Sequence, residues 1–145
     1  MIRQKNYILL VEEDANDRHI LHRSFEEIHW SSRLMLVDSA EEAIQYLGSV
    51  PDDLLPSLIV LDHNRPLSNS TEVLMRLKQV DACKNIPVVL YSASMSSLLA
   101  YRLTSLGAHC CFYKPKDSLS AVSLARALKT IAEGHQQVQH EVSLN

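Results

Sequence analysis

The stretch "LIVLDHNRP", from Leu58 to Pro66, places four apolar residues directly before Asp62. An apolar run without alternating polar residues is typical of a strand that is buried on both faces of a sheet. Burial of the neighbouring carboxylate costs free energy unless another group compensates its charge. Asp62 is therefore either a turn residue that follows the strand or part of a polar site that uses its charge.

Four further apolar runs alternate along the chain with helical patterns of apolar residues. Together with the first run they predict strands at 7–11, 34–37, 57–61, 86–91 and 110–113. The helices between them are predicted from apolar stripes at Leu21, Phe25 and Ile28, at Ala43, Ile44 and Leu47, at Val73, Leu74 and Leu77, and at Leu99, Leu103 and Leu106, with a last helix at 118–133. This order predicts an α/β fold with three layers, built on a doubly wound sheet of five parallel strands.

Polar residues and glycines predict where several helices begin and end. Ser39 and Glu42 have the spacing of a capping box, and Asp14 is expected to cap the first helix. Gly107 and Gly134 are expected to end the two helices before them, and the segment 48–56 is expected to be a loop.

Composition limits the class of protein. The 145 residues fit one domain, here predicted at 1–134 with a polar C-terminal tail at 135–145. The net charge of -3 argues against a nucleic-acid-binding protein, which usually has a basic face. No apolar run approaches the roughly 20 residues that span a bilayer, and the first residues do not resemble a signal peptide. We therefore expect a cytoplasmic protein without a membrane partner.

The cysteines and histidines do not form a recognisable metal or disulfide pattern. Cys83, Cys110 and Cys111 are odd in number and make no CxxC pair, so buried reduced thiols on a strand are expected. His19 and His22 are expected on a solvated helix face, and His63 and Arg65 at the surface.

Polar residues follow four of the five predicted strands. Glu12, Glu13 and Asp14 follow the first strand, and Asp62 follows the third. Ser92 and Lys114 follow the fourth and fifth strands, at 92 and 114. Because ligands of such sheets bind beyond the carboxyl ends of the strands, we expect these side chains to form one composite site.

Four motifs in order, "ILLVEED", "LIVLDHNRP", "VVLYSAS" and "GAHCCFYKP", resemble the receiver domain of two-component response regulators. The resemblance extends from about residue 7 to about residue 133. It implies a flavodoxin-like strand order, 2-1-3-4-5, and a stand-alone receiver domain at 1–134. It also implies that Asp62 accepts a phosphoryl group from a sensor histidine kinase or a His-phosphotransfer protein.

The resemblance further implies a Mg²⁺ site and a phosphoryl-contacting site. The metal would be held by Glu12, Glu13, Asp62 and the backbone carbonyl of Asn64, and hard oxygen ligands of this kind suit Mg²⁺. The phosphoryl group would be contacted by two further residues, the hydroxyl of Ser92 and the ammonium of Lys114. The family also implies a cis peptide bond at Pro115.

Three residues depart from the family pattern. Glu13 replaces the usual aspartate ligand, so the Mg²⁺ affinity is expected to be low. Ser70 replaces a glycine after the phosphoacceptor turn, and Cys111 replaces the aromatic switch residue that usually accompanies the hydroxyl of Ser92. These departures keep open an alternative function, a degenerate receiver that acts as a phosphorylation-independent interaction module.

The expected output is protein contact through the face formed by helix 4, strand 5 and helix 5, as is usual in the family. The domain would receive and slowly lose its own phosphoryl group without turning over a separate substrate, so it is not expected to be an enzyme. A flavin-binding or phosphatase-like enzyme on the same fold class is a weaker alternative, because the chain has only three glycines and no Gly-rich phosphate loop.

Overall fold

Five short strands pair in parallel in the order β2-β1-β3-β4-β5. They are β1 (Ile8–Val11), β2 (Leu34–Val37), β3 (Leu58–Asp62), β4 (Val88–Ser92) and β5 (Cys110–Tyr113). The computed structural model describes residues 6–63 and 70–144, with side chains as far as His135. The predicted strands, their parallel pairing and their order are confirmed, with boundaries that shift by one or two residues.

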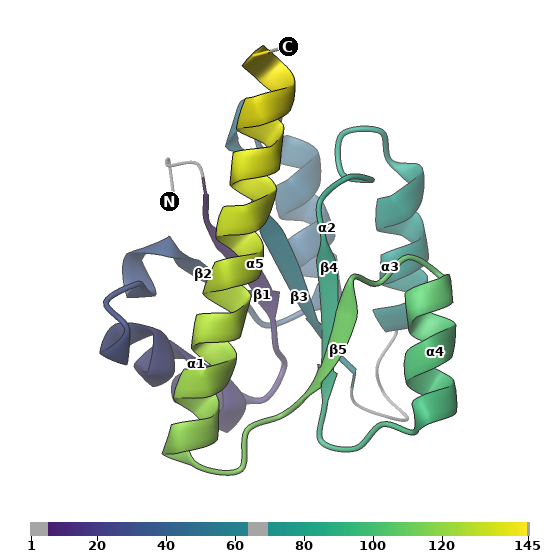
Figure 1. The fold of residues 1–145 in the computed structure, drawn as a ribbon. Helices are drawn as coiled ribbons and strands as arrows, with labels where there is room; N and C mark the ends of the chain where they lie inside the picture. Colours follow the sequence, from purple (N-terminus) through teal and green to yellow (C-terminus); the bar gives the residue numbers. More distant parts are fainter. Residues whose placement is uncertain (1–5, 64–69, 145) are drawn as a thin grey trace.

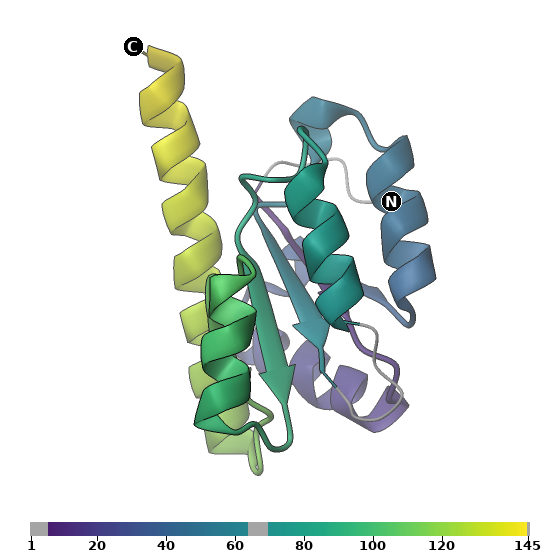
Figure 2. The same cartoon turned by 90° about the vertical axis from the view of Figure 1, so that its right-hand side faces the viewer.

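Helices cover both faces of the sheet and complete the three predicted layers (Figure 1). One layer contains α1 and α5, and the other contains α2, α3 and α4 (Figure 2). The helices are α1 (Ala15–Glu27), α2 (Ala40–Ser49), α3 (Ser70–Gln79), α4 (Ser97–Ser105) and α5 (Ser118–Leu144), with short 3-10 turns at Ser31–Arg33 and Asp52–Leu54.

Alternating residues of each central strand contribute to two separate hydrophobic cores. In β1, Leu9 and Val11 pack in the core beneath α2, α3 and α4. Ile8 and Leu10 pack in the core beneath α1 and α5. Each fully buried apolar side chain stabilises the fold by about 1.5–3 kcal/mol. Burial on both faces explains why the strands are unbroken apolar runs.

The helix boundaries predicted at Asp14, Ser39 and Gly107 are confirmed. The side chain of Asp14 accepts a hydrogen bond from the backbone N–H of Asp17 at 2.9 Å, and Ser39 accepts one from the N–H of Glu42 at 3.1 Å. Gly107 follows α4 with a φ of 116°, in the left-handed region that favours glycine. These local signals hold α1, α2 and α4 at the positions that the sequence predicts.

The last helix is longer than predicted. It does not end at Gly134 but continues to Leu144, and both views show it projecting beyond the sheet (Figures 1 and 2). One glycine in a helix costs only about 1 kcal/mol relative to alanine, so the flanking residues extend the helix through it. Gly48 likewise lies inside α2 rather than in the predicted loop.

The cysteines fit the expectation of buried reduced thiols on a strand only in part. All three are free thiols, as predicted, but only Cys83 is buried, and it lies after α3 rather than on a strand. Cys110 and Cys111 are half-buried because β5 is the edge strand of the sheet. Burial still raises the pKa of both thiols, which disfavours the reactive thiolate.

A basic groove of about 630 Å³ lies at the amino edge of the sheet, beside α5. The stem of Lys78 passes over Gly107, and its ammonium donates hydrogen bonds to the carbonyls of Ile86 at 3.0 Å and Lys84 at 3.3 Å. The other lining residues include His109 and His135.

Within the described residues, no helix has both the length and the apolar character needed to cross a bilayer.

Candidate functional site at the carboxyl edge of the sheet

The polar residues predicted to converge do lie at one edge of the sheet. Glu12 directly follows the last residue of β1, and Asp62 is the last residue of β3. Ser92 ends β4, and Lys114 directly follows β5. Because all strands are parallel, these four positions share the carboxyl edge, the part of the fold where α/β proteins bind ligands.

The ammonium of Lys114 is the centre of this edge. Its Nζ lies 2.9 Å from Oδ1 of Asp62 and 3.0 Å from Oε1 of Glu12. A third carboxylate, Oδ2 of Asp17 in the first turn of α1, lies 3.0 Å from the same Nζ. Asp62 is therefore not an isolated buried acid, because a lysine from the far end of the chain compensates its charge.

Burial and charge shift the pKa of two of these groups. Burial alone would lower the pKa of Lys114, but its hydrogen bonds to Asp62, Asp17 and Glu12 raise it above the usual value of 10.5. Burial raises the pKa of Glu12, and the neighbouring Asp62 raises it further. Lysine is thus held as a cation, while the fully buried glutamate has a reduced preference for its charged form.

The loop between β1 and α1 is fixed by an arginine. Nη1 of Arg18 donates hydrogen bonds to the backbone carbonyls of Glu12 at 2.7 Å and Glu13 at 2.9 Å. The backbone N–H of Asp14 donates to Oε2 of Glu12 at 3.2 Å. The Glu13 side chain is exposed, unlike that of Glu12. The acidic pair therefore has one buried member and one that faces solvent.

The residues expected to act as a switch lie on β4 and β5. The Ser92 hydroxyl is buried and donates a hydrogen bond to the carbonyl of Ser94 at 2.9 Å. Cys111 lines a small cavity together with Tyr113 and Met95, and the Tyr113 hydroxyl donates to the Met95 carbonyl at 3.1 Å. The aromatic ring near this loop is thus that of Tyr113, two residues after Cys111.

The residue after Asp62 was predicted wrongly. His63 was expected at the surface, but it is buried, and its Nδ1 lies 2.6 Å from the hydroxyl of Ser70, at the start of α3. Asn64 and Arg65 lie outside the described residues. The peptide geometry expected at Pro115 stays a prediction.

Two residues of the site were missed by the sequence reasoning. Asp17 forms an ion pair with Lys114, and the Tyr91 hydroxyl donates a hydrogen bond to Oε1 of Glu12. The position of Asp17, in the first turn of α1, gives a weak signal, because acids in a first turn usually serve only the helix. Tyr91 is 79 residues from Glu12, so no local pattern connects them.

The donor set at this edge fits a hard divalent cation in its chemistry. Glu12, Glu13 and Asp62 supply carboxylate oxygens, the ligands that Mg²⁺ prefers. In the structure, the positive charge that lies among three carboxylates is the ammonium of Lys114. In the part of the chain that the structure describes, no group of three acidic, histidine or cysteine side chains is already arranged to hold a metal ion.

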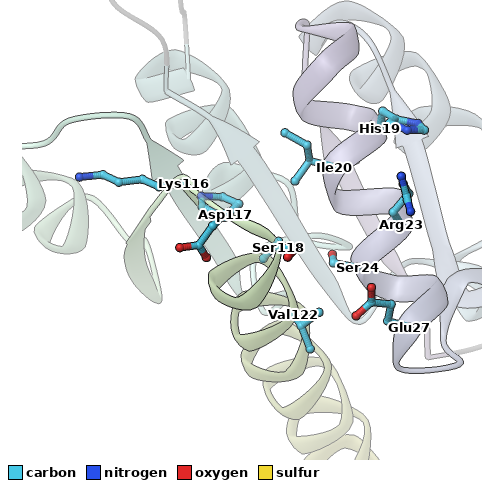
Figure 3. Close-up of a pocket in the computed structure, with 11 residues that line it drawn as sticks. His19, Ile20, Arg23, Ser24, Glu27, Lys116, Asp117, Ser118 and Val122 are labelled. Atoms are coloured by element: carbon cyan, nitrogen blue, oxygen red, sulfur yellow. The ribbon is translucent and has the colours of Figure 1, made fainter.

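A second groove, of about 280 Å³, lies between α1 and the start of α5 (Figure 3). His19 and Arg23 of α1 are among its lining residues, as are Lys116 and Asp117 just before α5. As predicted, His19 is exposed. Since Pro115, next to Lys114, also lines the groove, its shape depends on the position of the loop that carries the lysine.

Comparisons with known proteins agree with this geometry. A family model described as "Response regulator receiver domain" matches residues 8–126. The two-component response regulator ARR5 of Arabidopsis thaliana is 34% identical over 95 residues, which are 60% of this chain and 50% of ARR5. The chain therefore spans about half the length of this relative.

Two solved structures are similar in fold. The phosphorylated cyanobacterial phytochrome response regulator RcpA has a TM-score of 0.72 at 24% identity, over 88% of this chain and 92% of RcpA. The Mn²⁺-bound response regulator Rcp1 has a TM-score of 0.69 at 24% identity, over 86% of this chain and 91% of Rcp1. The family match extends from β1 into α5 and includes Asp62, Ser92 and Lys114, so the chain belongs to the receiver domain family of two-component response regulators.

Proposed function

We propose that this chain is a phosphoacceptor receiver domain, in which Asp62 accepts a phosphoryl group with the help of Mg²⁺. The observation that supports this most directly is the contact of 2.9 Å between Lys114 Nζ and Asp62 Oδ1, with Glu12 on the same ammonium. Burial of the Glu12 and Asp62 carboxylates costs free energy of folding. A functional role for this group of charges would explain why the fold keeps it.

The residues have separate parts in the proposed reaction. A carboxylate oxygen of Asp62 attacks the phosphorus of the donor, so that the new O–P bond forms as the donor's bond to phosphorus breaks. The Lys114 ammonium neutralises negative charge on the transferred group. The Ser92 hydroxyl, which now donates to the Ser94 carbonyl, turns to donate to a phosphoryl oxygen.

Receiver domains bind Mg²⁺ or Mn²⁺ in their acidic pocket. In this chain, Glu12, Glu13 and Asp62 would hold the ion with their side chains, and the resemblance adds the carbonyl of Asn64. The bound ion would supply positive charge that neutralises the phosphoryl oxygens. We infer a low affinity, because the side chain of Glu13 is one methylene longer than the usual aspartate and Mg²⁺ tolerates little distortion of its coordination shell.

Response regulator receivers interact with histidine kinases or phosphotransfer proteins. We propose a cytoplasmic donor of this kind and an output by protein contact through the face formed by α4, β5 and α5. Three large apolar side chains support this face, since Leu98, Tyr101 and Leu119 are 73–78% exposed. No separate substrate turnover is proposed.

The coupling from Asp62 to this face runs through the loop after β4. Ser92 holds the Ser94 carbonyl, and Tyr113 of β5 holds the Met95 carbonyl of the same loop. A turn of the Ser92 hydroxyl would release the first contact. The second lies at the output face, so a change in the loop would reach it without an aromatic residue at position 111.

The test is incubation with acetyl phosphate and Mg²⁺, followed by intact-mass measurement and mapping of hydroxylamine-labile phosphate. We expect one phosphoryl group, dependent on Mg²⁺, that is absent from the Asp62→Asn variant. Equal labelling of that variant would refute the assignment of Asp62. Complete lack of labelling in the wild-type chain, with intact binding of a partner, would instead support the degenerate interaction module.

A further inference from the structure

Tyr91 combines a buried ring with a hydroxyl that reaches the polar site. It precedes Ser92 on β4, is paired in register with Asp62 on β3, and is only 1% exposed. Its ring packs in the core beneath α1 and α5. Its hydroxyl, however, donates a hydrogen bond to Oε1 of Glu12, the residue after β1, although one strand, β3, lies between β4 and β1.

The same side chain also supports the ammonium of the site. Nζ of Lys114 lies 5.1 Å from the centroid of the Tyr91 ring, which is within the range of a cation–π interaction. Burial, and then the nearby Glu12, raise the pKa of the Tyr91 hydroxyl, so it stays protonated and remains a donor. Tyr91 therefore contacts an acid with its hydroxyl and a cation with its ring.

These contacts limit how the Glu12 carboxylate can turn. Oε1 is shared between the Tyr91 hydroxyl and Lys114, and Oε2 accepts the backbone N–H of Asp14. Both oxygens of a fully buried carboxylate are therefore fixed by donors. Hydrogen bonds from neighbouring residues to a metal-binding side chain typically set its orientation, and their loss lowers the metal affinity.

We propose that Tyr91 is a positioning residue of the phosphoacceptor site. Its hydroxyl fixes the Glu12 carboxylate toward the cation position, and its ring supports the Lys114 ammonium. The Mg²⁺ part of this inference rests on the function proposed above, whereas the orientation of Glu12 and Lys114 does not. The two parts can therefore be tested separately.

The main variant is Tyr91→Phe, which removes one oxygen atom and keeps the ring. Isotope-detected NMR of the Glu12 carboxyl carbon and the Lys114 ammonium, without metal, reports on orientation. Calorimetric titration with Mg²⁺ reports on affinity. We expect a shifted Glu12 signal, a retained Lys114 signal, and an Mg²⁺ affinity that is lower by roughly tenfold.

Two further variants make the test specific. Tyr91→Leu removes the ring as well, so both the Glu12 and the Lys114 signals should change. Tyr7→Phe is the matched control, because it removes the hydroxyl of another buried tyrosine, which contacts Tyr46 and the Leu54 carbonyl at the amino end of the strands, away from the site. That control should leave both signals and the Mg²⁺ affinity unchanged.

The outcomes separate this inference from the proposed function. An unshifted Glu12 signal in Tyr91→Phe, or an equal shift in Tyr7→Phe, overturns the role of Tyr91. If the wild-type chain is neither phosphorylated nor able to bind Mg²⁺, the proposed function fails, and the two NMR signals still decide the positioning role. If Tyr91→Leu does not fold, the result of Tyr91→Phe decides it.

Discussion

Nδ1 of His63 lies 2.6 Å from Oγ of Ser70, and both side chains are buried. The pair connects the residue after the phosphoacceptor candidate to the first residue of α3. Ser70 stands where the receiver family usually has glycine, so the hydroxyl takes part in a contact that the usual residue cannot make. The departure from the family pattern thus has a structural partner one position after Asp62.

The Ser70→Ala variant should be less stable than the wild-type chain. Removal of the hydroxyl leaves the buried His63 ring without this partner, which costs about 1–3 kcal/mol of unfolding free energy. Urea unfolding would measure the change. Ser105→Ala is the control, because that exposed hydroxyl donates to the carbonyl of Tyr101 in its own helix, one turn before it. Equal losses in both variants would mean that the contact with His63 contributes nothing specific.

Replacement of Asp17 by Asn should favour binding of an anionic phosphoryl mimic at Asp62. Asp17 is 34% exposed and holds Lys114 in the resting arrangement, so it competes with a phosphoryl group for the ammonium. Its removal should increase the affinity for beryllofluoride, measured by calorimetry with saturating Mg²⁺, by roughly twofold to fivefold, as expected for a partly exposed ion pair.

Asp14→Asn is the matched control for Asp17. It removes one negative charge three residues before Asp17, at the start of α1, and asparagine caps helices as well as aspartate does. Asp14 caps α1 by accepting from the Asp17 N–H, whereas the described carboxylates that contact Lys114 are those of Glu12, Asp17 and Asp62. If both variants bind the mimic equally well, the effect is one of net charge rather than competition for the lysine.

The Glu13→Asp variant should bind Mg²⁺ more tightly, by roughly threefold to tenfold, because the shorter side chain brings its carboxylate to the position used by the family. Arg18 fixes the backbone carbonyl of residue 13, so the main chain cannot move to compensate for the longer glutamate. Calorimetry is the suitable readout, since Trp30 is buried in the core beside Phe25 rather than at the site. Unchanged affinity would show that the pocket has adapted to glutamate.

The free energy of unfolding should depend on pH because of His135, which lines the basic groove together with Lys78. Burial, and then the charge of Lys78, hold its pKa below the usual value of 6.5. Its contribution is therefore complete above about pH 6.5 and is lost as pH falls through the lower, folded-state pKa. Urea unfolding of the His135→Gln variant and the wild-type chain should be compared at about pH 5 and about pH 7.5. The stability of the variant relative to wild type should be greater at the lower pH.

Salt provides the control for the His135 prediction. Added salt screens the contribution of Lys78 but leaves that of burial, so the difference between the two pH values should become smaller without disappearing. A difference between variant and wild type that is the same at both pH values would contradict the prediction.

Local features of the sequence predicted much of the fold. The apolar runs before Glu12 and Asp62 became buried strands, and Asp14, Ser39 and Gly107 cap or end helices as expected. These signals depend only on neighbours within about one helical turn. The strand order came from the resemblance to receiver domains, since apolar runs alone do not specify which strands pair.

Contacts between distant residues were the part that sequence could not predict. Tyr91 and Glu12 are 79 residues apart, and Lys114 and Asp17 are 97 residues apart. Which side chains meet at this distance depends on strand register and on the direction in which each side chain leaves its strand. The prediction that the last helix ends at Gly134 was wrong for another reason. The cost of one glycine is small compared with the helix propensity of the residues around it.

The basic groove lies at the amino end of the strands, whereas three carboxylates that share the one ammonium of Lys114 lie at the carboxyl end. Lys78 and Lys84 line the amino end, while Glu12, Asp17 and Asp62 lie at the carboxyl end. An anionic phosphoryl donor that approaches Asp62 therefore meets an opposing field until a cation neutralises it. Moderate salt, which screens fields beyond about 8–10 Å, should speed such encounters, whereas it slows encounters between oppositely charged partners.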